Sequence, residues 1–317
     1  MEKTQVDMIR ECLSGSRTVF HYAPESYALQ LLRDYIGNGM GIGALRRSPY
    51  AKLLTKPIVA EALALAGNGV LEPWHLEAVA AEYRTHKPLN FILTLDEWGT
   101  DDKDDRHWKQ ICRTGYDLVL QLNFANDHQQ PFKTLIHTDG GVAPFSYHGH
   151  PVRKDGRLET LAWARIDLDF ASNQALIEEI QSDWVKNAAN SDQDWQYGAD
   201  KMQQYREVLR PYSKVWDEAI LTAALCFIRR ELGIREVFYH SYDTGNRLKG
   251  IERYYEYGKP PRYLYTDLPK KFCFVKTSEA PDFLKPVRYL HYLQRHGKAQ
   301  WFKLPTQEKP HGKKAAA

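Results

Sequence analysis

The sequence predicts a mixed α/β fold of the α+β class, with a mixed central sheet and a helical N-terminal extension. Residues 1–87 carry mainly apolar residues at helical spacing, and from Pro88 the pattern changes to that of extended strands. Further along, a strand, a helix, a second strand and a second helix follow one another, which indicates a crossover between two parallel strands. We therefore expect a helical extension over 1–87, a mixed α/β domain over 88–305 and a disordered tail over 306–317.

The extension starts with an apolar stretch, Thr18–Tyr22, that suits a short strand. A helix is expected after Pro24, and Gly37 and Gly39 end it. Its apolar residues recur at helical spacing: Ala28, Leu31, Leu32, Tyr35 and Ile36. Three more helices are expected, over Ala44–Leu54, Pro57–Ala66 and Pro73–Tyr83.

Four strands are expected in the first half of the mixed domain. Leu89–Leu95 and Tyr116–Ala125 are rich in residues that favour strands. Leu161–Phe170 alternates strictly, with small and apolar side chains on one face and Trp, Arg and Asp side chains on the other. The short turn ASNQ joins it to Ala175–Trp184 (ALIEEIQSDW), so these two strands should form a hairpin.

The second half of the domain contains the clearest helix. Before it, Asn187–Gln204 is polar and is expected to be a loop or an exposed insertion. Ser213 suits the N-cap of the helix, and Gly233 suits its end. Its buried stripe comprises Trp216, Ile220, Ala223, Ala224, Phe227 and Ile228. The strand Arg235–Asp243 follows, then a turn at Thr244–Asn246 and a helix that carries Ile251, Tyr254 and Tyr255.

Composition excludes several classes of protein. The 317 residues are 43% hydrophobic and 26% charged, which is typical of a globular chain and not of a disordered one. No apolar run reaches the roughly 18 residues of a membrane span, and the N-terminus is too polar for a secretory signal, so a cytoplasmic protein is expected. The four cysteines form no CxxC pair, which predicts buried, reduced thiols.

The strand Ala175–Trp184 is the first candidate site, because it carries acidic groups on both faces. Glu179, Gln181 and Asp183 share one face, and Glu178 and Ser182 lie on the other. If the hairpin loop holds an even number of residues, Glu179 lies on the apolar side; if the number is odd, Glu179 lies beside Arg165 and can pair with it. A salt-bridged sheet face is the simpler alternative to a site.

A second candidate site is His240–Asn246 (HSYDTGN), where His240 and Asp243 could serve acid–base chemistry. A plain turn explains the same residues equally well. A third stretch, His137–Gly141 with His148 and His150, resembles metal ligands, but a loop rich in Gly and His is the simpler interpretation, and no metal is expected. The glycines of Gly37–Gly43 are only loosely similar to a phosphate loop.

The C-terminal segment is basic and aromatic, and it has no acidic residue between Phe283 and Gln307. Arg288, His291 and Arg295 fall along one helical face, with Lys298 beyond them. Such a face could contact phosphates while nearby aromatic side chains stack on bases. The alternative is a helix that packs through apolar residues and leaves its charges in solvent: Val287, Leu290 and Leu293.

Two resemblances follow from these motifs. The octet IEEIQSDW (Ile177–Trp184) resembles a domain of large polyvalent proteins of phages and mobile elements; the match covers roughly Asp139–Asn246, and it implies no activity. The order of hairpin, helix, strand, Asn246 and YYEYG (Tyr254–Gly258) is similar to the second half of GNAT-type acyltransferases. That resemblance implies a bound acetyl-CoA or other acyl-CoA. The family's glycine-containing pyrophosphate loop is replaced here by QSDWVKNAANSDQDW.

The expected function is that of a GNAT-like acyl- or group-transfer enzyme acting on an amine-bearing or nucleotide-like substrate. The GNAT resemblance would make Glu179 the base and Tyr255 or Tyr254 the acid, with His240 as another possible proton donor. The expected substrate-binding residues are Glu178, Gln181, Ser182, Asp183, Trp184, Asp243 and Asn246. One alternative is a non-catalytic nucleic-acid-binding or phage-conflict accessory protein that uses the basic C-terminal face, and another is an ADP-ribosyltransferase-type toxin.

Overall fold

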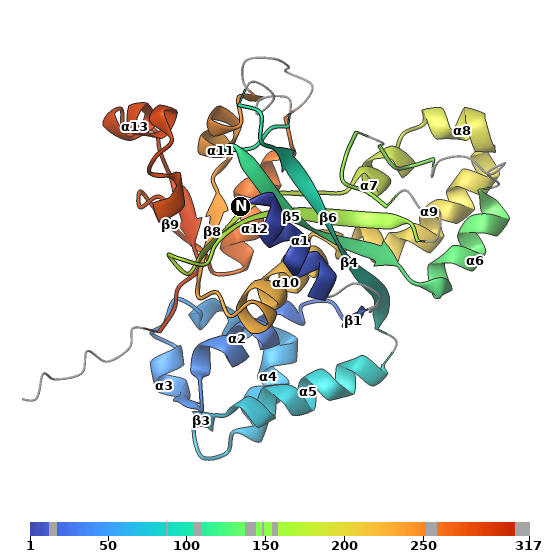
Figure 1. Ribbon diagram of the computed structural model, residues 1–317. Helices are drawn as coiled ribbons and strands as arrows, with labels where there is room; N and C mark the ends of the chain where they lie inside the picture. The colour runs from blue at the N-terminus through green and yellow to red at the C-terminus, as the bar shows by residue number, and fades with distance from the viewer. Residues whose placement is uncertain are drawn as a thin grey trace, which may run out of the picture.

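A mainly antiparallel sheet of eight strands forms the centre of the molecule, in the order β1-β4-β5-β6-β7-β8-β10-β9 (Figure 1). The computed structural model describes residues 1–12, 18–86, 88–103, 109–136, 144–147, 149–153, 158–251 and 259–307. Within these ranges β7 and β8 form the parallel pair, and the expected mixed α/β architecture is confirmed. The strands are β1 (Thr18–Tyr22), β4 (Leu89–Thr100), β5 (Gly115–Phe124), β6 (Thr160–Asp169), β7 (Gln174–Gln181), β8 (Glu236–His240), β9 (Val275–Thr277) and β10 (Trp301–Lys303).

The N-terminal part is a layer of helices against one face of this sheet, although its strand β1 pairs with β4 at the sheet edge. The helices are α1 (Lys3–Cys12), α2 (Tyr27–Ile36), α3 (Ile42–Leu45), η1 (Ala51–Thr55), α4 (Pro57–Leu65) and α5 (Pro73–Thr85). A single helix over Ala44–Leu54 was a wrong prediction. Pro49 disfavours a helical Ser48, and the Ser48 hydroxyl accepts the N–H of Tyr50 instead. The small sheet of β2 (Met40–Gly41) and β3 (Val70–Leu71) lies in the same layer.

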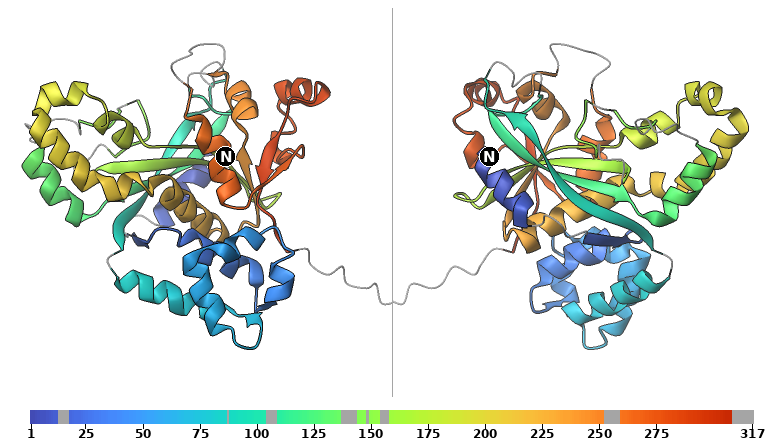
Figure 2. Two further views of the ribbon diagram at one scale, coloured as in Figure 1. Left: turned by 180° about the vertical axis from the view of Figure 1, so that it is seen from behind. Right: turned by 45° about the vertical axis from the view of Figure 1, so that its right-hand side comes forward.

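A second group of helices lies beyond the end of β7, on the opposite side of the molecule from α13 (Figures 1 and 2). It comprises α6 (Asn126–Leu135), α7 (Asp183–Ala188), α8 (Asp192–Tyr197) and α9 (Ala199–Ser213). Asn187–Gln204 is therefore largely helical rather than a loop, whereas the alternative of an exposed insertion agrees with α8, which has no buried residue. The polar composition of α9 conceals a buried stripe at helical spacing: Met202, Tyr205, Leu209 and Tyr212.

The expected long helix is confirmed as α10 (Trp216–Cys226), which continues into a π-helical turn, η3 (Phe227–Glu231). All six residues of its predicted stripe are buried, and α10 packs on β6 and β7. Ser213 does not cap it, because Ser213 ends α9 and its hydroxyl donates to the carbonyl of Arg210. Gly233 follows the π-helical turn with a φ of 70°, as expected for a helix-ending glycine.

The C-terminal part covers the far edge of the sheet with α11 (Tyr242–Leu248), η5 (Arg262–Tyr265), α12 (Asp267–Lys271), η6 (Asp282–Leu284) and α13 (Arg288–Arg295). The expected turn at Thr244–Asn246 was wrong, because these residues lie inside α11. Gly245 is needed there, since a Cβ at this position would lie 3.0 Å from the Cβ and Cγ of His240. The predicted helix around Tyr254 and Tyr255 lies outside the described residues.

The two faces of the sheet differ in polarity. The face toward α10, called the inner face, carries Leu118 and Leu120 of β5 and Ile166 of β6 in the main hydrophobic cluster. The opposite, outer face carries Asp117, Arg165 and other polar side chains, and the loops before β5 and β6 cover it. Among the described residues, no helix combines the length and hydropathy that a membrane crossing needs. None of the four cysteines forms a disulfide, and Cys12 is exposed, against the expectation of burial.

Candidate active site

A β-bulge in β7 places both of its glutamates on the outer face. Arg165 of β6 pairs with Glu179, but the next residue, Ile166, pairs with Ile177, so Glu178 is an extra residue in β7. The hairpin loop, residues 170–173, holds an even number of residues, for which Glu179 was expected on the apolar side. That expectation was wrong, because the bulge places Glu179 beside Arg165 instead. Alternation from Ile177, which lies on the inner face, keeps Glu178 on the outer face but would turn Glu179 inward. One carboxylate oxygen of Glu178 lies within 4.8 Å of those of Asp117 and Asp167. Four acidic side chains therefore meet on one buried face.

Glu179 is held by two cations. Its Oε2 accepts hydrogen bonds from the Arg165 guanidinium and, at 2.9 Å, from Nζ of Lys249. Burial alone would raise the pKa of Glu179, but the charges of Lys249 and Arg165 outweigh it and lower this pKa to about 2. A carboxylate with so low a pKa accepts a proton poorly near neutral pH. The catalytic role of Glu179 stays a prediction, and the geometry favours a structural role.

Glu178 and His240 lie in the same buried region, on either side of Cys112. The backbone N–H of Cys112 donates to Oε1 of Glu178 at 3.1 Å, and the Cys112 Sγ lies 2.9 Å from Nε2 of His240. Burial, and then the charges of Lys249 and Arg165, lower the pKa of His240 well below its usual range. His240 is therefore a neutral imidazole without solvent access. The predicted partner Asp243 lies exposed on α11, at the wall of a separate pocket.

The remaining acids of this face are compensated differently. Arg113 donates to both carboxylate oxygens of Asp167, at 2.6 and 2.7 Å. Asp117 lies 4.0 Å from a nitrogen of Arg165. Burial, followed by the charges of Glu178 and Asp167, raises the pKa of Asp117 well above its ordinary value. This region is consequently a closed ion network rather than an open reaction site.

An open arrangement lies where β7 ends. Nδ1 of His150 lies 2.9 and 2.8 Å from the two carboxylate oxygens of Asp183. Gln181 donates from Nε2 to Oδ1 of Asp183 at 2.7 Å, and Nε1 of Trp163 lies 3.5 Å from Oδ2. Asp183 is 7% exposed, while His150 is 29% exposed. In a neutral His150 this contact assigns the proton to Nδ1, which leaves Nε2 as a proton acceptor.

The octet IEEIQSDW shapes the turn that presents Asp183. Ser182 caps α7, because its Oγ accepts the N–H of Val185 at 3.1 Å and donates to the carbonyl of Leu161 at 2.6 Å. Trp184 is fully buried, and its Nε1 donates to the hydroxyl of Tyr205 at 2.6 Å. The predicted strand over Ala175–Trp184 therefore stops at Gln181. Ser182 and Trp184 anchor the turn, whereas Gln181 and Asp183 hold His150.

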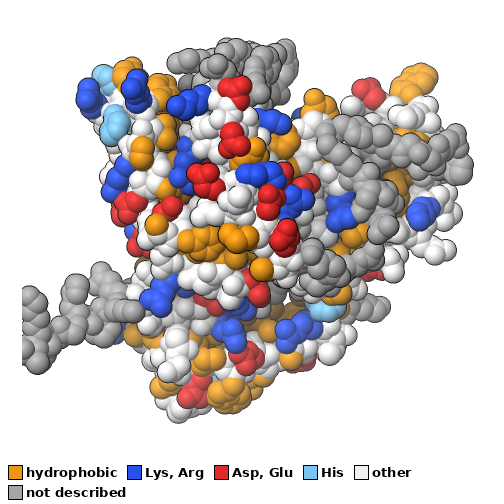
Figure 3. Space-filling model, in the orientation of Figure 1, with side chains coloured by type: hydrophobic (Ala, Val, Ile, Leu, Met, Phe, Trp, Pro, Cys, Tyr) orange, Lys and Arg blue, Asp and Glu red, His pale blue; other side chains and the backbone are white. Residues whose placement is uncertain are grey.

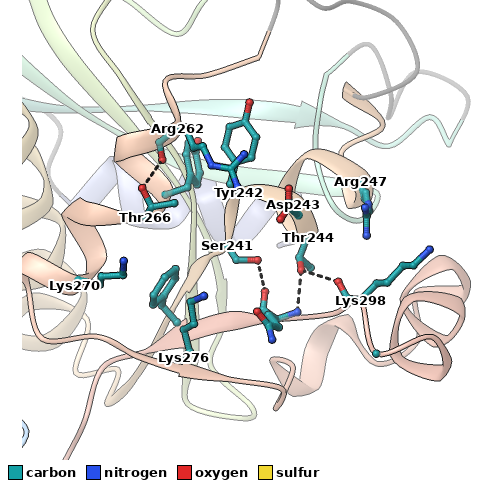
Figure 4. Close-up of a pocket in the computed structure, with 14 residues that line it drawn as sticks. Ser241, Tyr242, Asp243, Thr244, Arg247, Arg262, Thr266, Lys270, Lys276 and Lys298 are labelled. Carbon is teal, nitrogen blue, oxygen red and sulfur yellow. Dashed lines mark hydrogen bonds between the residues drawn. The ribbon is translucent and has the colours of Figure 1, made fainter.

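A basic pocket of about 310 Å³ lies at the end of β8 (Figure 4). Ser241 and Thr244 form its floor through hydrogen bonds to the backbone of Gln300. The Arg262 guanidinium lies 4.9 Å above the ring of Tyr242. Asp243 is the single acidic residue in the lining of the pocket. Five cationic residues line it: Arg247, Arg262, Lys270, Lys276 and Lys298. This composition suits an anionic ligand.

The helix α13 packs through apolar residues and leaves its charges in solvent, as the alternative to a phosphate-contacting face predicted. Leu290 and Leu293 are buried, and Val287 packs against the same cluster. The predicted phosphate-contacting residues are all exposed: Arg288, His291, Arg295 and Lys298. Figure 3 shows blue and pale blue side chains gathered where α13 lies. Lys298 also lines the basic pocket, so the two basic surfaces adjoin.

The structure thus divides the predicted site residues into separate groups. Glu178, Glu179 and His240 join the closed network, Gln181 and Asp183 form the open arrangement with His150, and Asn246 is buried within α11. Tyr255 lies outside the described residues. Sequence reasoning considered His150 only as a metal ligand and missed Lys249 altogether, because neither residue lies near its partner in the chain.

Comparison with known proteins adds no relative to this description. No protein-family model, curated protein or solved structure matches the chain. The resemblances read from IEEIQSDW and from the order of elements in the second half of the chain stay predictions.

Proposed function

We propose that this chain is a group-transfer enzyme in which His150 takes a proton from the acceptor substrate. The observation that carries this proposal is the contact of His150 with the buried carboxylate of Asp183. A carboxylate on Nδ1 orients an imidazole and stabilises its protonated form, while Nε2 remains available to an amine or a hydroxyl. Gln181 and Trp163 hold Asp183 in place, so His150 is the general base and Asp183 is a positioning residue.

The arrangement of the second half supports a GNAT-like fold for this enzyme. The hairpin β6–β7, the crossover helix α10, the parallel strand β8 and the helix α11 follow one another in the order on which the resemblance rests. Pairing between the parallel strands extends only to Ile177 and Tyr239, and β7 continues to Gln181 paired with β6 alone. His150 and the basic pocket lie at the carboxyl ends of β7 and β8, where open α/β sheets bind ligands.

The acyl-coenzyme A donor implied by the resemblance does not fit the loop after β7. A diphosphate in such a loop needs free backbone N–H groups and positive charge. Here Ser182 already uses the N–H of Val185, and Asp183 adds a carboxylate at the same turn. We therefore derive no step through coenzyme A.

The basic pocket favours a nucleotide-like substrate. Five cationic residues and one carboxylate line it, and the amino groups of Lys270 and Lys276 point toward the same space in Figure 4. Phosphate groups are bound by such convergent Lys and Arg side chains. The pocket is thus suited to hold the phosphates of a substrate, at the end of the strand next to β7.

The test is consumption of a donor by the wild-type chain and by His150→Ala. Acetyl-CoA, NAD⁺ and ATP are each incubated with spermidine or a nucleotide as acceptor, and mass spectrometry follows donor and product. One donor should be consumed by the wild-type chain and at least about 100-fold more slowly by His150→Ala. His86→Ala is the matched control, because His86 is an exposed histidine at the end of α5. Equal rates in His150→Ala, or no consumption of any donor, would reject the proposal.

The exposed charges of α13 favour a second candidate function, nucleic-acid binding. Arg288 and Arg295 lie on the surface of a helix that packs through its opposite face, and Tyr289 stacks on Tyr292. Phosphate contacts make affinity fall steeply with salt.

Filter binding of a single-stranded oligonucleotide should therefore show a salt slope that the double variant Arg288→Gln/Arg295→Gln reduces by roughly 1.4. The control removes two exposed lysines of the α9 region, Lys201→Gln/Lys214→Gln. Absence of binding at low salt excludes this candidate.

A further inference from the structure

Three metal-ligating side chains meet beside the ion network and take no part in the proposed reaction. Cys112, Glu178 and His240 each offer a ligand atom, and these atoms lie within 4.8 Å of one another. All three residues have no exposed surface. They come from the loop before β5, the bulge of β7 and the last position of β8, so the fold brings together residues that are far apart in the chain.

Glu178 is the acid of this face whose charge is not compensated. Asp167 is bound by Arg113, Asp117 lies near Arg165, and Glu179 is bound by both Arg165 and Lys249. Within the described ranges Glu178 forms no ion pair. Its Oε1 accepts the N–H of Cys112, and its Oε2 is buried without a hydrogen-bond partner. A buried carboxylate oxygen of this kind calls for a cation.

We propose that Cys112, Glu178 and His240 bind one Zn²⁺ ion. A thiolate, an imidazole and a carboxylate are the three ligand types of protein zinc sites, and the combination of sulfur with nitrogen disfavours Mg²⁺ and Ca²⁺. The Cys112 Sγ and the His240 Nε2 are already 2.9 Å apart. An increase of this separation by about 0.6 Å would seat a tetrahedral ion at about 2.3 Å from sulfur and about 2.0 Å from nitrogen. Nδ1 of His240 then keeps the proton.

The parallel pairing of β7 with β8 makes this site possible. Leu176 and Phe238 are paired and share a hydrophobic cluster with Cys112, so the next side chains on that face are Glu178 and His240. With the ion in place, the loop before β5 is fastened to both strands of the parallel pair. The same loop receives Arg165, which donates to the carbonyls of Lys109 and Gln110 at 3.0 and 2.9 Å. The role of the zinc is structural, and the proposal does not depend on the function of His150.

The experiment measures zinc in the full chain, prepared without a polyhistidine tag. Plasma mass spectrometry after dialysis should find about one zinc ion per chain. Replacement of zinc by Co²⁺ should give a near-ultraviolet absorption band from charge transfer between the thiolate and the cobalt ion. Cys112→Ala should lose this band, and its zinc affinity should fall by more than the roughly 10–100-fold that changes around a zinc site cause.

Cys273→Ala is the matched control, because Cys273 is also buried and belongs to no such ligand cluster among the residues described. It should retain the zinc and the cobalt band. If Cys112→Ala fails to fold, the wild-type chain still decides. A folded wild-type chain that contains no stoichiometric zinc, and that binds neither Zn²⁺ nor Co²⁺ in a competition titration with a chelator, overturns the proposal.

Discussion

Two acidic positions of one short segment have opposite surroundings. Glu179, inside β7, is buried between Arg165 and Lys249 and has a pKa lowered to about 2. Asp183, just beyond the strand, is also buried but faces His150, whose ring is 29% exposed. The first carboxylate is neutralised by two cationic side chains that the fold holds in place. The second faces a partly exposed imidazole, so the proposed chemistry is assigned to the strand end and a structural role to the bulge.

The energetic consequences of the two arrangements also differ. An ion pair in a dry interior must offset the desolvation of both partners, so removing one partner leaves an uncompensated buried charge. Glu179 has two such partners, and Lys249 is 1% exposed. Asp183 has neutral partners in Gln181 and Trp163, and its histidine is partly in solvent. Loss of the Asp183 charge therefore leaves no buried cation without its anion.

Replacing the carboxylates by amides should separate these roles most clearly. Glu179→Gln leaves Arg165 and Lys249 without their anion, and it should lower the free energy of unfolding by about 3–5 kcal/mol. Asp183→Asn keeps the shape and loses a hydrogen bond to His150, so it should cost about 1–2 kcal/mol. Urea unfolding followed by far-ultraviolet circular dichroism measures both values.

The two variants should rank in the opposite order by their effect on activity. Asp183→Asn should retain its fold and lose the donor consumption that depends on His150, whereas any folded fraction of Glu179→Gln should retain it. If Glu179→Gln is as stable as the wild-type chain but inactive, the comparison is reversed and Glu179 becomes the catalytic carboxylate. Double substitution of Glu179 and Lys249 by Gln and Met should recover part of the lost stability, because it removes a buried cation together with its anion.

The sequence predicted the framework better than the site. Periodicity located the strands β4 to β8, the helices α2 and α10, and the parallel pair, because each of these elements buries a regular apolar stripe. It missed the helices within Asn187–Gln204, because two of the four buried side chains of α9 are tyrosines and all four stand among polar or charged residues. It also failed at α11, where Thr244, Gly245 and Asn246 have the composition of a turn but are buried within a helix.

The site depended on two features that spacing does not reveal. A bulge changes the face of Glu179, and alternation cannot show where an extra residue enters a strand. The partners of Glu179 and Asp183 are distant in sequence: Lys249 is 70 residues from Glu179, and His150 is 33 residues from Asp183. The octet IEEIQSDW identified the segment that contains Glu179 and Asp183, but the different partners of these two residues could be seen only in the tertiary structure.

Lowering the pH tests the same contrast between Glu179 and Asp183 with a smaller effect, because acid removes the Glu179 charge without a mutation. The folded-state pKa of Glu179 is about 2 and its ordinary value is 4.5, so its contribution to stability is present above about pH 4.5 and is lost as the pH falls toward 2.

His128, whose pKa burial lowers to about 3, also destabilises the fold in acid, beginning below about pH 6.5. The measured quantity is therefore the difference in unfolding free energy between the wild-type chain and Glu179→Gln, to which His128 contributes equally. This difference should shrink by an amount on the order of 3 kcal/mol between pH 5 and pH 2. A difference that stays constant over this range would show that the Glu179 charge does not stabilise the network, and the contrast between the two carboxylates would rest on exposure alone.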